Sequence, residues 1–416
     1  MNKLLITVLS IASFLVARAQ NNFVIPSSLN QIIVNGFGGV GSSKIPQEFM
    51  NKFIFPDFIN NDLKDLTTEK LSDKNLFGGE AGGSYNIVIN LSNNSKKKIK
   101  KFIGFGFGTQ LEGNLYFTKD LFDLTFYGNK PFAGETKSLN ETSFNALSYS
   151  YFEGTFGLTF THKNGFSSIW TDLSALVGHG YSKFEVGSGS FFTEETGDYL
   201  DVSLTESILE ISDTSNSDFS QGIGGKLDIN FAKKTDSYNL LFSLENIGGI
   251  YWDNTTQADL DTTFTFQGIE IGDIFQLSDS VLNEVSSIDS LLEIRTENKF
   301  KSLPVNIIAY YKGEMEKFNF DVFIKHRLFT NYTPYLRAGF NFNLPVFKPG
   351  LVVAYGGYSN IQLGINTDIE IGKHIKLQLG TNNILGVIAP ETSTALDFYA
   401  GIRYTYKDKL IKRPNF

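Results

Sequence analysis

The chain has 416 residues and a formal charge of −8, and it contains 39 phenylalanines, 18 tyrosines and 39 glycines but no cysteine. The lack of cysteine excludes a disulfide scaffold and thiolate metal sites, and the acidic balance argues against nucleic acid as a partner. Many aromatic residues and few prolines (10) are typical of a protein built from β-strands.

The first nineteen residues have the pattern of a secretory signal peptide. Lys3 precedes an apolar run over residues 4–16, and small residues end the segment near Ala19. The run is shorter than the roughly 20 residues that a membrane-spanning helix needs. We therefore expect residues 1–19 to be removed on export. Because no later apolar run is longer, the exported chain is expected to be either soluble or a β-barrel.

Further along, side chains alternate between apolar and polar with the period of a β-strand. In residues 238–252, Leu240, Phe242 and Leu244 share one face, and Tyr238 and Trp252 stand at its two ends. Fifteen residues at roughly 3.3 Å each, tilted by about 45°, are long enough to cross the apolar band of about 25 Å of an outer-membrane barrel. Strands of soluble sandwiches are usually shorter, at roughly 5 to 10 residues.

The same pattern predicts fourteen strands, an even number as single-chain bacterial barrels require. They cover residues 31–41, 79–91, 101–117, 145–161, 166–186, 221–233, 238–252, 303–314, 317–328, 333–344, 350–357, 360–371, 374–385 and 395–406. We predict an all-β fold, a transmembrane antiparallel β-barrel of about 14 strands over residues 20–406, followed by a basic C-terminal tail over 407–416.

The predicted connections alternate between short and long. Short lysine-containing turns lie on one side, and the long segments 42–78, 118–144, 187–220 and 253–302 lie on the other. With the N-terminus in the periplasm, the long segments face outside, as in known outer-membrane barrels. A soluble sandwich has no reason to sort its loops in this way.

Two segments depart from the strand pattern and predict short helices in the long loops. Residues 117–129 form one, with Thr118 as N-cap, and residues 278–295 form the other, with Ser278 or Asp279 as N-cap. Such helices either plug or cover the barrel, or pack within their own loop.

Four stretches together resemble a group of Bacteroidetes outer-membrane barrels catalogued as a domain of unknown function. They are "FSLENIGGIYW", "KFIFPDFINNDLKD", "DLFDLTFYGNKPFAG" and "GSFFTEETGDYLDV". This group is distantly similar to FadL-like long-chain fatty-acid transporters and to PorP/SprF-like barrels associated with secretion and gliding. The resemblance implies a barrel of about fourteen strands, but no substrate and no functional residue.

Little in the sequence points to catalysis or to a cofactor. His162, His179, His326 and His374 lack the spacing of metal ligands, and the glycine cluster at 104–108 lacks the context of a phosphate loop. We predict no catalytic, cofactor or metal site and no enzymatic activity, because no residue is marked as a nucleophile.

The polar faces of the predicted strands would line the lumen if the apolar faces meet lipid. The candidates are Glu112, Glu153, Asp228, Glu245, Asp321, Lys325, Arg337, Asp368, Glu370, Lys376, Asp397 and Arg403. These charges either brace the lumen as ion pairs or line a conducting path.

Two functions remain open. The first is an outer-membrane barrel for passive uptake or binding of a small compound, a hydrophobic one included. The second is an accessory barrel that docks a secretion, gliding or surface-assembly partner through its long acidic loops or basic tail. Membrane lipid is the expected partner in both.

Overall fold

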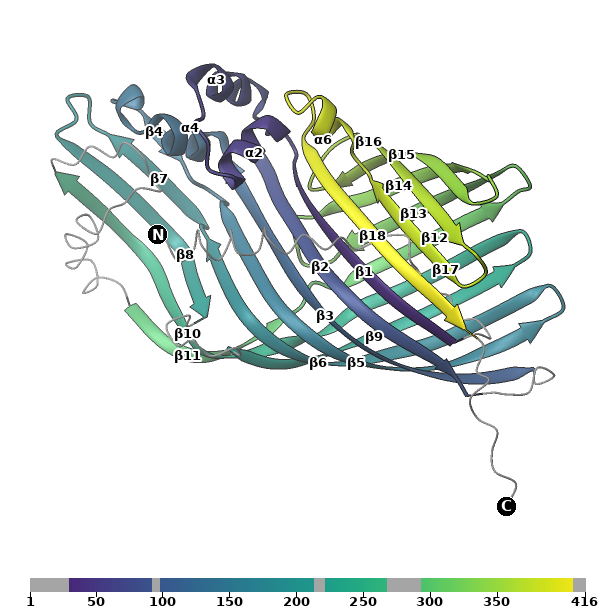
Figure 1. Ribbon diagram of the computed structural model, residues 1–416. Helices are drawn as coiled ribbons and strands as arrows, with labels where there is room; N and C mark the ends of the chain where they lie inside the picture. The colour runs from purple at the N-terminus through teal and green to yellow at the C-terminus, as the bar shows by residue number, and fades with distance from the viewer. Residues whose placement is uncertain (1–29, 92–97, 213–220, 268–292, 407–416) are drawn as a thin grey trace.

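The computed structural model describes residues 30–91, 98–212, 221–267 and 293–406. Within these ranges, eighteen strands form one antiparallel sheet, and fourteen of them close into a barrel (Figure 1). The expected signal peptide and basic tail lie outside the described residues. Among the described residues, no helix combines the length and apolar character needed to cross a bilayer.

Each of the fourteen predicted strands corresponds to one barrel strand, so the predicted fold is confirmed. Around the ring the strands are β1 (Asn30–Ser42), β2 (Lys74–Asn90), β3 (Ile99–Thr118), β5 (Ser143–His162), β6 (Gly165–Glu185), β9 (Gly222–Thr235), β10 (Tyr238–Gln267), β12 (Asn306–Glu314), β13 (Phe318–Arg327), β14 (Thr333–Phe342), β15 (Phe347–Gly357), β16 (Gln362–Ile371), β17 (Ile375–Thr381) and β18 (Ala395–Tyr406). The pair Asn30 and Tyr406 joins β1 to β18 and closes the ring.

Four further strands lie in segments that the sequence predicted as loops. They are β4 (Thr136–Ser138), β7 (Ser188–Thr193), β8 (Tyr199–Ser212) and β11 (Glu293–Ser302). Strand β10 continues past Trp252 and pairs there with β8 and β11, while β8 pairs with β7 and β7 with β4. These four strands and the end of β10 form an extension, here called the distal sheet, beyond the long-loop end of the barrel (Figure 1).

The helix predicted over 278–295 falls almost entirely outside the described residues. Its last three positions, 293–295, belong to β11, where they pair with β10. The helix prediction is therefore wrong for those three residues.

The outer wall of the barrel is apolar and the inner wall is polar. On β13, Asp321 and Lys325 are buried inside while Ile324 between them is exposed on the outside. Phe105 and Phe156 on the outer wall are 60% and 59% exposed. An exposed apolar surface that surrounds the molecule is stable only against hydrocarbon. The barrel is therefore a transmembrane one.

The glycine cluster at 104–108 serves the packing of the wall. A Cβ atom on Gly106 would lie 1.9 Å from Asn86 Oδ1, and one on Gly108 would lie 2.6 Å from the Tyr151 hydroxyl oxygen. At Gly108 the carbonyl oxygen of Gly83 would also lie 2.5 Å from a Cβ, so the neighbouring strand excludes a larger residue there, whereas at Gly106 the Asn86 side chain would first have to move.

Short helices gather at the long-loop end (Figure 1). They are α2 (Gln47–Ile54), α3 (Asn61–Lys70), α4 (Lys119–Tyr127), the 3-10 turn η1 (Lys130–Phe132) and α6 (Leu385–Ile388). Helix α4 confirms the helix predicted over 117–129, since the Thr118 hydroxyl accepts a hydrogen bond from Leu121 N at 3.1 Å. Phe49 and Phe122 pack together between α2 and α4, with ring centroids 5.3 Å apart.

Candidate functional site: a lumen crossed by ion pairs

Four charged residues, here called the lumen strut, connect opposite walls of the barrel. Glu80 lies on β2, Glu112 on β3, and Lys325 and Arg327 on β13. Counted either way around the ring, β2 and β13 are seven positions apart out of fourteen. Contacts between them therefore cross the full width of the lumen.

The ion pairs of the strut are close. Arg327 Nη2 lies 2.7 Å from Glu80 Oε2, and Arg327 Nη1 lies 3.2 Å from Glu112 Oε2. Lys325 Nζ lies 3.1 Å from Glu80 Oε1. The Arg327 side chain is only 3% exposed, so its charge depends on these carboxylates for its stability.

Neutral groups complete the surroundings of Arg327. It donates hydrogen bonds to Asn306 Oδ1 at 3.3 Å and to the Tyr358 hydroxyl at 3.1 Å, and its guanidinium lies 5.0 Å from the centre of the Tyr332 ring. A planar guanidinium suits such a combination of ion pairs, hydrogen bonds and stacking. These surroundings therefore suit an arginine side chain specifically, and not every cationic side chain.

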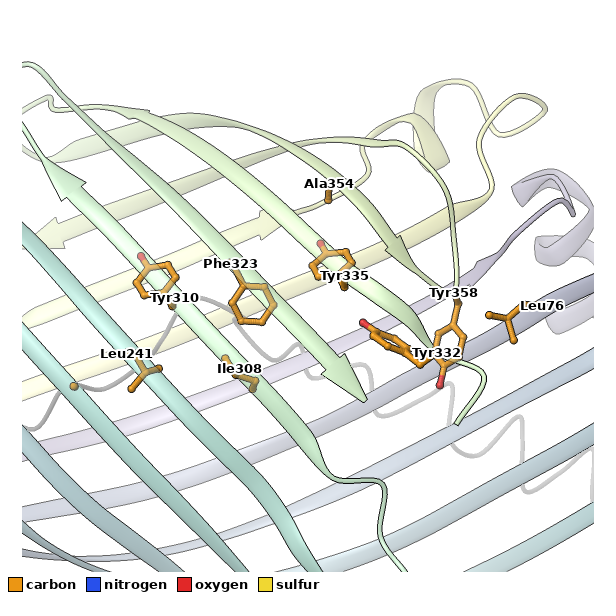
Figure 2. Packing of buried hydrophobic residues seen from close by; sticks show 10 residues of the cluster. Leu76, Leu241, Ile308, Tyr310, Phe323, Tyr332, Tyr335, Ala354 and Tyr358 are labelled. Atoms are coloured by element: carbon orange, nitrogen blue, oxygen red, sulfur yellow. The ribbon is translucent and has the colours of Figure 1, made fainter. Parts of the chain in front are cut away.

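Aromatic side chains fill the lumen beside the strut. Figure 2 shows Tyr332 and Tyr358 next to Leu76 of β2, which comes from another part of the wall. The two tyrosine rings meet edge to face, with centroids 5.1 Å apart. A Cβ on Gly78 of β2 would lie 2.5 Å from the Tyr358 ring. At this level the lumen is occupied by side chains that extend from different walls.

A polar cavity of about 640 Å³ lies at the short-turn end. Its charged lining residues are Lys234, Lys312, Glu314, Asp321, Asp368, Glu370, Lys373, Lys376 and Arg403. Some of these charges are paired along the wall: Lys376 Nζ lies 2.6 Å from Asp368 Oδ2, and Arg337 pairs with Asp321. Charges of both signs therefore face the cavity.

A third group of charges lies on one wall. Carboxylate oxygens of Glu153 on β5, Asp172 on β6 and Asp228 on β9 all lie within 4.8 Å of one another. Among the described residues, this acid trio is the one set of three or more potential metal ligands, and none of the four histidines belongs to it.

The structure places the twelve candidate lumen residues in these groups with few exceptions. Glu112 and Lys325 belong to the strut, and Glu153 and Asp228 to the acid trio. Those at or beside the cavity are Asp321, Arg337, Asp368, Glu370, Lys376 and Arg403. Asp397 accepts a hydrogen bond from Asn382 N at 2.7 Å. Glu245 pairs in register with Asn306 and belongs to none of the groups.

Four charged residues of the cavity lining, Lys234, Lys312, Glu314 and Lys373, were not among the candidates, and neither were three members of the strut and the acid trio. Arg327 and Glu80 lie at an end of a predicted strand, and Asp172 lies within one. Arg327 follows Asp321 and Lys325 at spacings of six and two residues, so period two alone would have placed it on the inner face.

Burial also affects groups at the helical, long-loop end. It raises the pKa of the Tyr127 phenol to about 12, and the Asp65 carboxylate, 2.6 Å away, acts in the same direction. It also raises the pKa of Asp123 on α4, although Lys137 opposes this shift. Asp123 Oδ1 has no hydrogen-bond partner among the described residues.

The chain is similar to several known barrels. One mutant of the TodX monoaromatic hydrocarbon channel matches with 8% identity over 92% of this chain and 91% of that chain, at a TM-score of 0.45. The toluene transporter TodX of P. putida matches with the same identity and coverage at 0.42. A mutant porin of Rh. blastica matches with 8% identity over 90% and 100% of the two chains, at 0.28. No curated protein matches.

A family model gives the stronger result. The model of a family of unknown function, DUF5723, matches residues 34–382. This match covers most of the sequence, and the chain therefore belongs to the DUF5723 family.

Proposed function

We propose that this protein is an outer-membrane channel that is closed at rest by the lumen strut and passively admits a small solute. The observation that carries the proposal is the set of ion pairs between Glu80 on one wall and Lys325 and Arg327 on the opposite wall. A channel that opens needs an interaction that blocks the lumen and can be broken. The ion pairs of the lumen strut have both properties.

A purely structural role explains the strut less well. Backbone hydrogen bonds between neighbouring strands already close the ring, and pairs such as Arg337 with Asp321 brace adjacent strands. An ion pair across the full width of the lumen does not strengthen the pairing of neighbouring strands. It places charged groups where a solute would have to pass, as the gates and filters of channels do.

The cavity indicates the class of solute. Its volume of about 640 Å³ lies within the range of about 300–1,000 Å³ that small-molecule sites occupy. Charges of both signs line it, including Arg403 and Asp368. This lining favours a small polar solute that carries charge over the hydrophobic compound that the sequence left open.

The apolar outer wall and the expected signal peptide over residues 1–19 support insertion into the outer membrane after cleavage near Ala19. In the proposed orientation, the helices and the distal sheet face outside and the polar cavity faces the periplasm. Outer-membrane lipid would then be the constant partner of the chain.

Uptake into proteoliposomes tests the proposal. Vesicles with purified protein would be assayed with cationic, anionic, zwitterionic and uncharged solutes of similar size, for wild type and for a Glu80→Gln/Glu112→Gln variant that removes the acidic side of the strut. We expect faster uptake of charged solutes through the variant than through the wild type. If neither protein takes up any solute, and gently solubilised membranes yield a stoichiometric partner protein, the docking role is favoured instead.

A further inference from the structure

The acid trio has the geometry of a cation site. Glu153 and Ser174 are directly opposite each other on β5 and β6, and Asp172 and Asp228 are opposite each other on β6 and β9. The three carboxylates supply oxygens within 4.8 Å of one another. An ion that binds oxygen at about 2.4 Å can contact oxygens up to about twice that distance apart. Three oxygens within 4.8 Å of one another lie at most about 2.8 Å from a common centre, so one ion can contact all three carboxylates after a small movement of their side chains.

One ammonium group and several neutral donors surround the trio. Lys226 Nζ lies 2.6 Å from Asp228 Oδ2. Neutral groups donate hydrogen bonds to two of the carboxylates: the Thr155 hydroxyl and the Asn230 amide bond Asp172 at 2.6 and 2.9 Å, and the backbone N–H of Asn246 bonds Asp228 at 2.6 Å. Three carboxylates this close together repel one another, and a bound cation would offset that repulsion.

Ser174 supplies an independent observation. Its side chain is 3% exposed, and its Oγ has no hydrogen-bond partner among the described residues. It lies opposite Glu153 on one side and Lys226 on the other, and two residues from Asp172 on the same face of β6. A buried hydroxyl without a partner is unfavourable, and the strand register places this one between Glu153 and Lys226, on the same face of β6 as Asp172.

The backbone next to the trio is arranged to hold a carboxylate in place. Strand β10 has a bulge between Leu244 and Ile247, and Asn246 within it has a φ of 64°, a left-handed conformation. This conformation directs the Asn246 N–H to Asp228 Oδ1. Bulges that direct one group toward a site are typical of functional positions.

We propose that Glu153, Asp172, Asp228 and Ser174 bind Ca²⁺ in the barrel wall, with water completing the coordination. All four ligands are oxygens, which hard cations prefer, and no imidazole or thiolate is present that would select zinc or copper. Ca²⁺ accepts irregular coordination, whereas Mg²⁺ requires near-ideal octahedral geometry. The bound ion would join β5, β6 and β9.

The test uses the full chain purified in detergent and freed of metal with a chelator. Ca²⁺ should raise the Tm of the wild type, because a ligand that binds the folded state stabilises it. Tb³⁺, a luminescent substitute for Ca²⁺, should show sensitised emission, because Trp170 lies two residues from Asp172 on β6. We expect Asp172→Asn to abolish both responses and to have a higher Tm than the wild type in chelator, since one of three mutually repelling charges is removed.

The matched control is Asp368→Asn, which removes a buried carboxylate from β16, seven positions around the ring from β6. This variant should keep the Ca²⁺ and Tb³⁺ responses. Glu153→Gln provides a second test if Asp172→Asn does not fold. Absence of both responses in the wild type at millimolar Ca²⁺ would overturn the proposal, and so would equal responses in Asp172→Asn and Asp368→Asn. A rise in Tm with Mg²⁺ equal to that with Ca²⁺ would overturn the assignment of the ion.

Discussion

Replacing Arg327 by methionine should open the channel. The substitution keeps an unbranched side chain but removes the contacts of 2.7 and 3.2 Å to Glu80 and Glu112. Lys325 still neutralises Glu80, whereas the ion pair to Glu112 is lost. Removing one partner of a buried ion pair costs about 3–5 kcal/mol. Since about 1.4 kcal/mol corresponds to a factor of ten, a cost of about 3 kcal/mol in the closed state increases the open-to-closed ratio about a hundredfold.

Conductance in planar bilayers measures this ratio. We expect rare openings of the wild type and an open-to-closed ratio about a hundredfold higher for Arg327→Met at the same protein density. The control is Arg295→Met, which removes an exposed ion pair with Asp259 in the distal sheet. Exposed pairs contribute about 0–1 kcal/mol, and this one does not cross the lumen. A folded Arg327→Met variant that opens no more often than Arg295→Met would refute the gating role of the strut.

Three further predictions concern stability. Burial raises the pKa of Asp123 above its ordinary value of 3.8, so the folded state holds this proton more tightly, and the charged form opposes folding as the pH rises. Asp123→Asn should match the Tm of the wild type at low pH, exceed it increasingly as the pH rises from 3.8 through the raised pKa, and keep a constant margin above it. Lys119, Asp120, Glu135 and Lys137 share that surface; a difference that is the same at every pH would contradict this prediction. Thr118→Ala removes the N-cap of α4 and should destabilise the long-loop end by about 1 kcal/mol, measured by hydrogen exchange of α4 amides, with barrel amides as the internal control. Phe156→Lys places a charge on the outer wall and should reduce folding stability in lipid vesicles by about 2–4 kcal/mol, and an unchanged urea midpoint would show that this position does not meet hydrocarbon.

The sequence was sufficient to predict the barrel because the membrane imposes one pattern on every strand. Each barrel strand must present apolar side chains to lipid at every second position, as Ile324 does between Asp321 and Lys325. The alternation of apolar and polar residues is therefore visible in the sequence of all fourteen strands. The strands of the distal sheet have no such constraint. Strand β8, for example, lies in an acidic segment, and its composition alone predicted a loop.

The contacts of the lumen strut could not be predicted from sequence patterns, for a different reason. Alternation places Glu80 and Arg327 on the inner face, but 247 residues separate them along the chain. Their meeting depends on the number of strands and on the register of every pair between them. The acid trio is similar, since Asp172 meets Asp228 only through the register of β6 with β9.

Strand β10 belongs both to the barrel and to the distal sheet, because it runs without interruption for 30 residues. A movement of the distal sheet would therefore be transmitted to the barrel wall through β10 itself. The register of β10 is irregular near Asn246 and near Asn254, and both residues have a left-handed backbone conformation. These are two positions at which the strand can bend. The first adjoins the acid trio through the hydrogen bond from Asn246 N to Asp228, so bending of β10 there would displace one of the three carboxylates.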